Sequence, residues 1–173
     1  MYMRNFTLLI FIMMNYAHAE TIQGPNLGKP VSSAVVDRWN RDIFPNGEGL
    51  PTGAGSAYKG KIIYQQQCLS CHGVDGAGGS ADELAGALHS LTDDPPDKVV
   101  GNYWPYATTV FDFIRRSMPL HAPGKLSNDE VYAVTAYLLA LNGIISEDKI
   151  IDNNNLSKIE MPNRDGFINT FKK

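Results

Sequence analysis

The stretch Cys68-Leu69-Ser70-Cys71-His72 decides how this chain folds, because it places two thiols and an imidazole side by side. The pattern C-x-x-C-H is typical of covalent haem attachment. Two intervening residues let the chain fold back so that both sulfurs reach one porphyrin edge, while the adjacent imidazole comes under the ring. We therefore predict that Cys68 and Cys71 bond one haem c covalently and that His72 ligates its iron.

Two other interpretations of a C-x-x-C pair are weaker here. A zinc site needs a second pair of Cys or His ligands, whereas the chain contains only 2 cysteines. A thioredoxin-like redox pair follows a strand in a βαβ unit. Residues 57–67 before this pair instead look helical, and no strand alternation follows it.

The start of the chain predicts export. Arg4 precedes an apolar run at 6–14, and Ala17-His18-Ala19 is a small-x-small cleavage site. These are the parts of a secretory signal peptide, so we expect 1–19 to be removed after Ala19 and the product to reside in the periplasm. The run is shorter than the roughly 20 residues that a spanning helix needs. Nothing later in the chain reaches that length, so we expect no membrane span.

Composition and charge limit the class of protein and partner. The 173 residues are 43% hydrophobic and 10% aromatic, which suits a globular chain with a single core. The formal net charge is −3. This mild acidic excess argues against nucleic acid or an anionic membrane as partner, and it selects no particular protein partner. Both cysteines belong to the haem motif, so we expect no structural disulfide.

One helix is predicted directly before the motif, and a second is predicted near the end of the chain. Ser56 caps a helix over 57–67 that runs directly into Cys68, and Gly60 lies on the same face as Tyr64. Glycine inside a helix costs about 1 kcal/mol relative to alanine, which suggests that another helix crosses closely there. The natural partner is the helix over 128–141.

The helix over 128–141 has strong signals at both ends. Ser127 to Glu130 forms a capping box, and Asn142-Gly143 is a C-terminal stop. Its apolar residues recur at helical spacing and predict one buried face: Val131, Val134, Tyr137, Leu138 and Leu141.

A third helix is predicted to begin at Thr108 or Thr109 and to end before Pro119. Its apolar stripe consists of Phe111, Ile114 and Met118 at helical spacing. We predict Met118 as the second axial ligand, since a thioether is a soft iron ligand and His/Met pairs are common in this class of haem site. Met161 precedes a proline in the same way, but it follows the capped final helix. A bis-His site using His89 or His121, or an open sixth position, remains an alternative.

The segments outside these helices carry further expectations. Residues 73–97 should form a glycine-rich loop around the haem edge. The aromatic run 102–106 and Arg115-Arg116 could hold the haem propionates, or the aromatics could be core residues and the arginines solvated. Residues 21–56 contain one short helix candidate, from Ser32 or Ser33 to Trp39. We expect this arm to pack on the haem domain, with a flexible linker as the alternative.

The order of these features resembles a class I cytochrome c, and the chain is similar to the haem subunits of bacterial sulfite and sulfane dehydrogenases. The matching stretches are Gly49-Leu50-Pro51-x-Gly53-x-Gly55-Ser56, 100–109, 114–119, 129–133 and 160–167. The resemblance implies an all-α class I cytochrome c fold, with an arm at 20–56, the cytochrome c domain at 57–143 and a C-terminal tail at 144–173 wrapped on it. Some sulfane dehydrogenase haem subunits are longer and carry two haems, whereas this chain has one haem motif.

The resemblance implies an electron carrier rather than an enzyme. It would be a periplasmic subunit or electron acceptor of a molybdenum-dependent sulfite dehydrogenase, or of one acting on a related sulfur compound. A downstream cytochrome or oxidase would accept its electrons. The alternative is a haem enzyme that acts directly on thiosulfate or peroxide. Iron ligated by both His72 and Met118 has no open position, which favours the carrier.

Overall fold

The computed structural model describes residues 27–86, 91–96, 98–168 and 170–171. The chain divides into two compact units, Met1–Trp39 and Asn40–Lys173. In the first unit, helix α1 spans Ser33–Trp39, as predicted. The predicted signal peptide and His89 lie outside the described residues.

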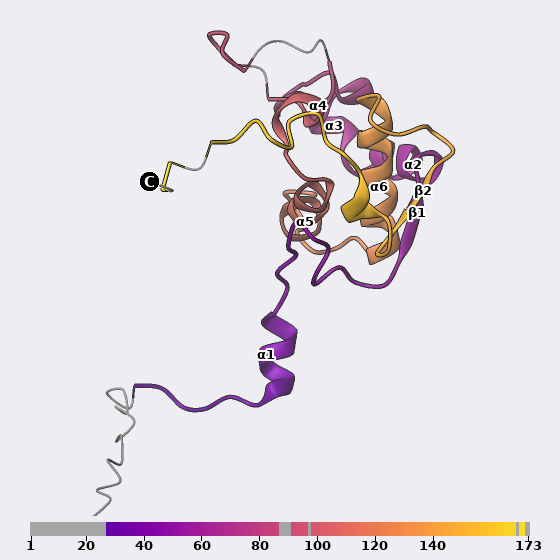
Figure 1. Cartoon of the computed structure of the whole chain (residues 1–173). Helices are drawn as coiled ribbons and strands as arrows, with labels where there is room; N and C mark the ends of the chain where they lie inside the picture. Colours follow the sequence, from indigo (N-terminus) through magenta and orange to yellow (C-terminus); the bar gives the residue numbers. More distant parts are fainter. Residues whose placement is uncertain (1–26, 87–90, 97, 169, 172–173) are drawn as a thin grey trace, which may run out of the picture. The chain divides into compact units, whose positions relative to one another are not determined.

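The second unit is mostly helical (Figure 1). Its elements in chain order are β1 (Ala54–Ser56), α2 (Ala57–Gln67), α3 (Leu69–His72), the 3-10 turn η1 (Val74–Gly76), α4 (Val100–Tyr103), α5 (Ala107–Ser117), α6 (Asn128–Leu141), β2 (Ile150–Asp152) and the 3-10 turn η2 (Leu156–Lys158). Within the described ranges, no helix has the length and apolar character needed to cross a bilayer.

Helix α6 is the centre of this unit, and its predicted bounds are confirmed. The Ser127 backbone N–H donates to the Glu130 carboxylate at 2.8 Å, and the Ser127 hydroxyl accepts from the Glu130 N–H at 3.4 Å, which completes the capping box. Every residue from Val131 to Leu139 is buried. The predicted single buried face was therefore too narrow, because other elements cover this helix on all sides.

Helix α2 crosses α6 closely at Gly60, as predicted. A Cβ atom at Gly60 would overlap the backbone carbonyl of Ala133, so only glycine permits this approach. Ser56 caps α2 by accepting the N–H of Lys59 at 3.5 Å. The crossing fixes the end of α2, where Cys68 begins the haem motif.

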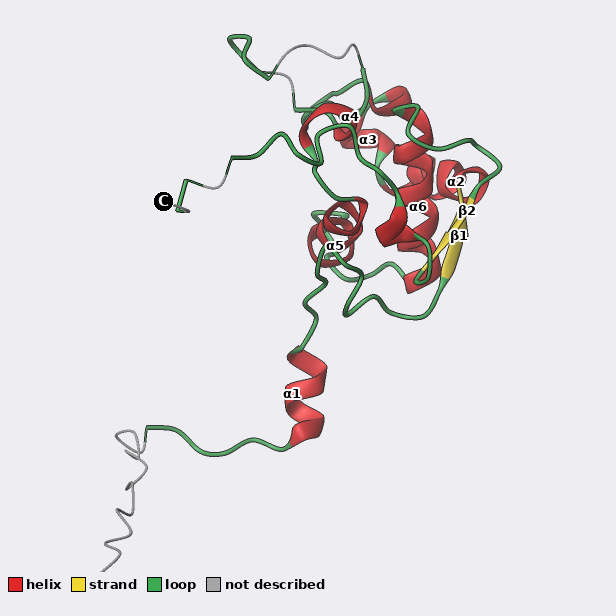
Figure 2. Ribbon diagram, in the orientation of Figure 1, coloured by secondary structure: helices red, strands yellow, loops and turns green. Residues whose placement is uncertain are grey.

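A small antiparallel sheet, which the all-α expectation did not include, lies beside these helices (Figure 2). Gly55 of β1 pairs with Ile151 of β2, and the Ile151 side chain is fully buried. Gly55 also contacts the backbone of α6 so closely that a Cβ atom would overlap Ala133. The strands thus join the segment before α2 to the C-terminal tail.

The tail wraps on the domain as expected. Leu156, Ile159 and Met161 are buried and belong to the core cluster. The arm is docked in part within this unit, because Ile43 and Leu50 pack against the same core.

Helix α5 begins slightly earlier than predicted. It starts at Ala107 rather than at Thr108 or Thr109, and Tyr106 precedes it without a side-chain capping hydrogen bond. Phe111 and Ile114 are buried as predicted, and the helix ends at Ser117. The loop after the haem motif contains one 3-10 turn, in line with the glycine-rich pattern.

The Gly60 crossing is tested by replacing Gly60 with Ala. Alanine has the better helix propensity, but its methyl group would meet the Ala133 carbonyl, and overpacking of this kind costs about 1–3 kcal/mol. We expect the Tm of the haem-loaded protein, followed by circular dichroism, to fall by about 5 °C. The exposed neighbour Lys61→Ala is the control and should leave Tm almost unchanged. A Gly60→Ala protein as stable as the parent would contradict the close crossing.

Candidate functional site

The haem motif lies where α2 gives way to the short helix α3. Cys68 ends α2, and its carbonyl accepts the N–H groups of Cys71 at 3.1 Å and His72 at 3.0 Å. This turn brings both sulfurs and the imidazole to one side of the chain. Gly73 ends α3 with φ 74°, and a Cβ there would overlap the carbonyl of Gly78. Only glycine allows the chain to reverse directly after His72.

The three motif side chains line a cavity of about 440 Å³. Its size is within the range of cofactor sites, and most of its wall is apolar. The cavity is lined by Tyr64, Gln67, Cys68, Cys71, His72, Ser80, Ala81, Leu84, Val100, Trp104, Val110, Phe113, Ile114, Met118, Pro119, Leu120, His121, Leu126, Val134 and Leu138. An apolar cavity that holds two thiols, an imidazole and a thioether fits a covalently attached haem.

His72 is oriented by the loop that follows it. Its Nδ1 lies 2.9 Å from the carbonyl oxygen of Asp82. Because a carbonyl can only accept, Nδ1 carries the proton and Nε2 keeps its lone pair free for a metal. The loop is held near the motif by the Gly78 N–H, which donates to the His72 carbonyl at 2.8 Å, and by the Ala81 N–H, which donates to the Cys71 carbonyl at 3.0 Å.

Two tyrosines support the backbone around the motif. The Tyr64 hydroxyl donates to the Gly73 carbonyl at 2.8 Å, and the Tyr137 hydroxyl donates to the Asp75 carboxylate at 2.8 Å. The centroids of their rings lie 5.2 Å apart. Burial is the main cause that raises the pKa of both phenols, so both remain neutral donors. The turn at Asp75-Gly76 is visible in the sequence, but the link to Tyr137, far along the chain, is not.

The cysteines do not resemble a redox pair. Burial, with a smaller contribution from Cys71, raises the pKa of the Cys68 thiol to about 11. Reactive C-x-x-C thiols have a lowered pKa. Within the part of the chain that the structure describes, no three His, Cys, Asp or Glu side chains gather as a metal site of their own. The raised pKa of Cys68 does not favour the thioredoxin-like alternative, and the described residues offer no further ligands for zinc.

Met118 reaches the cavity from the end of α5. Its N–H donates to the Ile114 carbonyl at 3.0 Å, and its extended backbone leaves the helix before the buried Pro119. Met161 is 3% exposed in the core and does not line the cavity. His121 also lines the cavity, but its side chain is exposed. Of the two methionines in the described residues, Met118 is therefore the one that shares a cavity with His72.

The expected propionate residues are separated by the structure. Trp104 lines the cavity, whereas Tyr103, Tyr106 and Arg115 do not. Arg116 forms ion pairs with Asp42 and Asp112, and neither of these residues lines the cavity.

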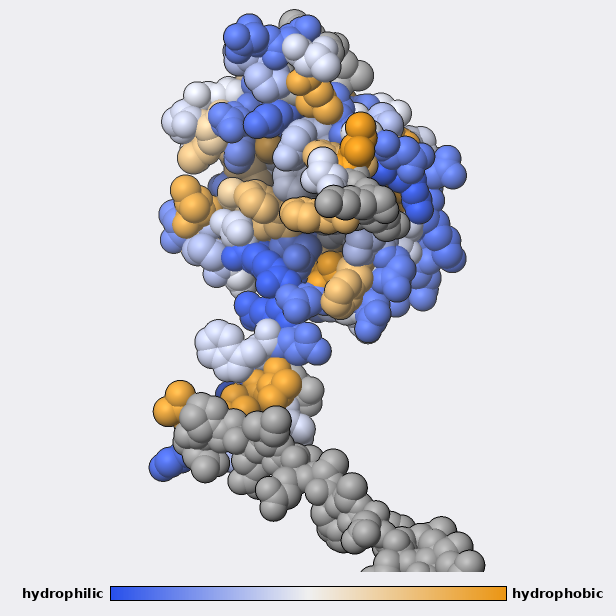
Figure 3. Space-filling model, turned by 60° about the vertical axis from the view of Figure 1, so that its left-hand side comes forward, coloured by the Kyte–Doolittle hydropathy of each residue, from blue (hydrophilic) through white to orange (hydrophobic). Residues whose placement is uncertain are grey.

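Two large apolar side chains lie among the exposed residues that line the cavity. Phe113 and Leu120 line the cavity and are 46% and 78% exposed. Figure 3 shows apolar side chains as orange patches among blue hydrophilic ones on one face of the molecule. Phe113 lies off the apolar stripe of α5, so the helical spacing of the sequence does not mark it.

Known proteins similar to this chain agree with this geometry. A family model described as cytochrome c matches residues 57–142. The chain is 32% identical over 116 residues to a thiosulfate dehydrogenase of Allochromatium vinosum, and 35% identical over 88 residues to a thiosulfate dehydrogenase of Stutzerimonas stutzeri. These alignments cover 65% and 51% of this chain but 39% and 28% of the relatives. The chain therefore spans well under half the length of these curated relatives.

A solved structure is similar over more of the chain. The crystal structure of the sulfane dehydrogenase SoxCD from Paracoccus pantotrophus contains a chain that superimposes with a TM-score of 0.77 and 38% sequence identity. The match covers 83% of this chain and 71% of that chain.

Covalent attachment is tested by extracting the purified, exported protein with acidified acetone. If Cys68 and Cys71 each form a thioether, the colour stays with the polypeptide. It should also stay in either single Cys→Ala variant, because one bond remains, and it should be extracted from the double variant. Loss of colour from the unmodified protein would contradict the assignment of this site.

Proposed function

The chain belongs to the cytochrome c family, and on that premise we propose that it is a periplasmic carrier of single electrons in bacterial sulfur oxidation. Family membership brings one covalently attached haem c, and the motif that would hold it occurs once. A bound haem supplies reversible uptake of one electron at its iron. The observation that carries the proposal is that His72 and Met118 line the same cavity.

We assign the cofactor contacts residue by residue. Cys68 and Cys71 would form the thioethers, and His72 and Met118 the axial ligands. The Asp82 carbonyl holds the Nδ1 proton of His72 and so presents Nε2 to the metal. If His72 and Met118 both ligated the iron, substrate would have no open position there.

The electron donor in this proposal is a molybdenum-dependent sulfite dehydrogenase, or one acting on a related sulfur compound. Sulfite oxidation is a two-electron oxygen transfer, which a single six-coordinate haem cannot perform. A separate enzyme must do that chemistry and pass on its electrons one at a time. The similarity to the sulfane dehydrogenase chain supports a partner of this kind. A downstream cytochrome or oxidase would then accept the electrons.

Direct oxidation of thiosulfate is the second candidate, and the names of the two curated relatives favour it. Both alignments leave more than half of the relative unmatched. The reaction would also require an iron position that Met118 fills in the arrangement proposed here.

The axial assignment is tested with Met118→Ala and Met161→Ala. Loss of the sulfur ligand should abolish the weak long-wavelength sulfur-to-iron band of the oxidised protein and lower its reduction potential. Met161→Ala removes a core side chain, so it should destabilise the protein by about 2–5 kcal/mol while the band persists. A band that survives in Met118→Ala and disappears in Met161→Ala would move the ligand to the tail.

The carrier role is tested by stopped-flow mixing of the oxidised protein with sulfite or thiosulfate, with and without a molybdenum sulfite dehydrogenase. We expect catalytic haem reduction only when the dehydrogenase is present, with two haems reduced per sulfite. Rapid reduction by either substrate alone would favour the enzyme instead.

Variants at the cavity mouth test whether the dehydrogenase docks there. Leu120→Lys replaces an exposed apolar side chain of the cavity lining with a charged one and should slow reduction by the dehydrogenase several-fold. Ile150→Lys is the matched control, because Ile150 is 61% exposed and does not line the cavity. Equal effects of the two variants would argue against docking at the mouth.

A further inference from the structure

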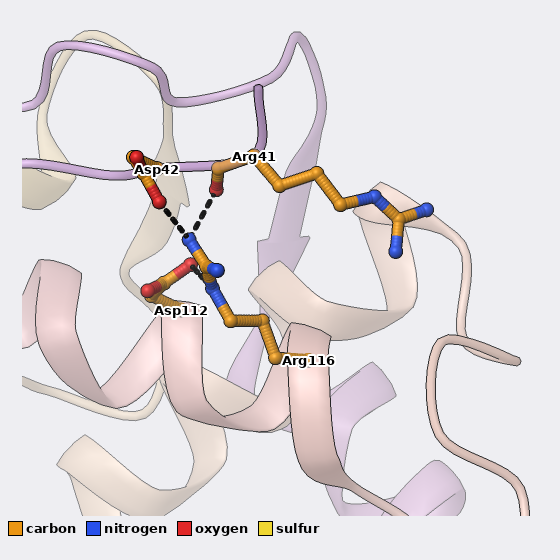
Figure 4. Close-up of polar contacts among 4 residues, drawn as sticks. All are labelled: Arg41, Asp42, Asp112 and Arg116. Carbon is orange, nitrogen blue, oxygen red and sulfur yellow. Dashed lines mark hydrogen bonds and ion pairs between the residues drawn. The ribbon is translucent and has the colours of Figure 1, made fainter. Parts of the chain in front are cut away.

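Arg116 joins three acceptors from two parts of the chain. Its Nη2 donates to the Arg41 carbonyl at 2.7 Å and to the Asp42 carboxylate at 3.0 Å, and its Nε donates to Asp112, one turn earlier in α5, at 2.8 Å. Figure 4 shows the side chain of Arg41 directed away from this cluster, so Arg41 contributes its backbone only. The planar guanidinium group binds several acceptors in fixed directions, which lysine cannot do.

The segment that supplies Arg41 and Asp42 is a folded turn rather than a loose strand. The Phe44 N–H donates to the Glu48 carbonyl at 2.9 Å, which closes the turn. Gly49 has φ 84°, and a Cβ atom there would overlap the Asp42 carbonyl. Ile43 is packed against the core. Arg116 is therefore bound to a fixed point on the domain.

The other end of this connection is the last turn of α5, which leads directly to Met118. Arg116 is two residues before Met118, and the helix ends at Ser117. Helix ends fray unless side chains hold them. Asp42 is 69% exposed and Arg116 is 38% exposed, and an isolated pair this exposed contributes little. We therefore expect these contacts to add little to the stability of the whole fold. Their consequence is local, because they restrain the last turn of α5.

We propose that Arg116 is a positioning residue that ties the last turn of α5 to the turn at 41–49 and so keeps Met118 on the iron. This inference rests on the proposed role of Met118 as axial ligand. Without the tie, the last turn opens more often and Met118 leaves the iron more often. The apparent affinity of an external ligand rises in proportion to the open fraction.

The test is titration of the oxidised haem protein with imidazole, followed by loss of the sulfur-to-iron band. Arg116→Gln should raise the apparent affinity for imidazole by up to about fivefold, because exposed charged contacts of this kind shift a local equilibrium by no more than about that factor. Asp42→Ala should raise it in the same direction. If Arg116→Gln does not retain haem, the titration of Asp42→Ala tests the inference in its place. Arg116→Lys, with charge but no fork, should lie between the parent and Arg116→Gln.

Asp129→Ala is the matched control. The Asp129 carboxylate accepts the Ala54 N–H at 2.9 Å, so it ties the same arm to α6 rather than to α5. The variant should leave imidazole affinity unchanged. Parent-like affinity in Arg116→Gln and Asp42→Ala, or an equal rise in Asp129→Ala, would overturn this inference and leave the Met118 assignment in place. Absence of the sulfur-to-iron band from the parent protein would overturn the Met118 assignment and this inference with it.

Discussion

The close crossing of α2 and α6 is the contact on which the site depends. Because Gly60 lets α2 meet the backbone of α6 at Ala133, the end of α2 is held in place, and Cys68 begins the haem motif there. Tyr64, one turn after Gly60, uses the same proximity. Its ring lies against Tyr137 of α6, and its hydroxyl binds the backbone that follows the motif. A change at the crossing would therefore be transmitted to the cavity.

The elements with local signals could be predicted from the sequence, and those made by distant contacts could not. The capping box gave the start of α6, and Ser56 gave the start of α2. The strands β1 and β2 are three residues each and nearly a hundred residues apart, so no periodicity marks them. At the site, residue chemistry pointed to the motif and Met118. The Asp82 carbonyl that orients His72 is a backbone atom, which no residue type reveals.

The similarities to other proteins suggest two functions, a haem enzyme and an electron carrier. The number of iron ligands that the protein supplies distinguishes them. Two thiosulfate dehydrogenases are similar to this chain in sequence, and a sulfane dehydrogenase chain is similar to it in fold. An enzyme acting at haem needs an open iron position, whereas an electron carrier benefits from two fixed axial ligands, because little then moves when the iron changes charge. The placement of Met118 at a helix end tied by Arg116 suits the second requirement.

Carbon monoxide binding to the reduced protein tests the central claim most directly, because this ligand binds ferrous haem only where an axial position is free. The protein would be reduced under anaerobic conditions, exposed to carbon monoxide and followed by its absorption spectrum, with Met118→Ala as the positive control. The account predicts an unchanged spectrum for the parent protein and a stoichiometric adduct for the variant. A full adduct in the parent protein would contradict a closed, six-coordinate electron carrier.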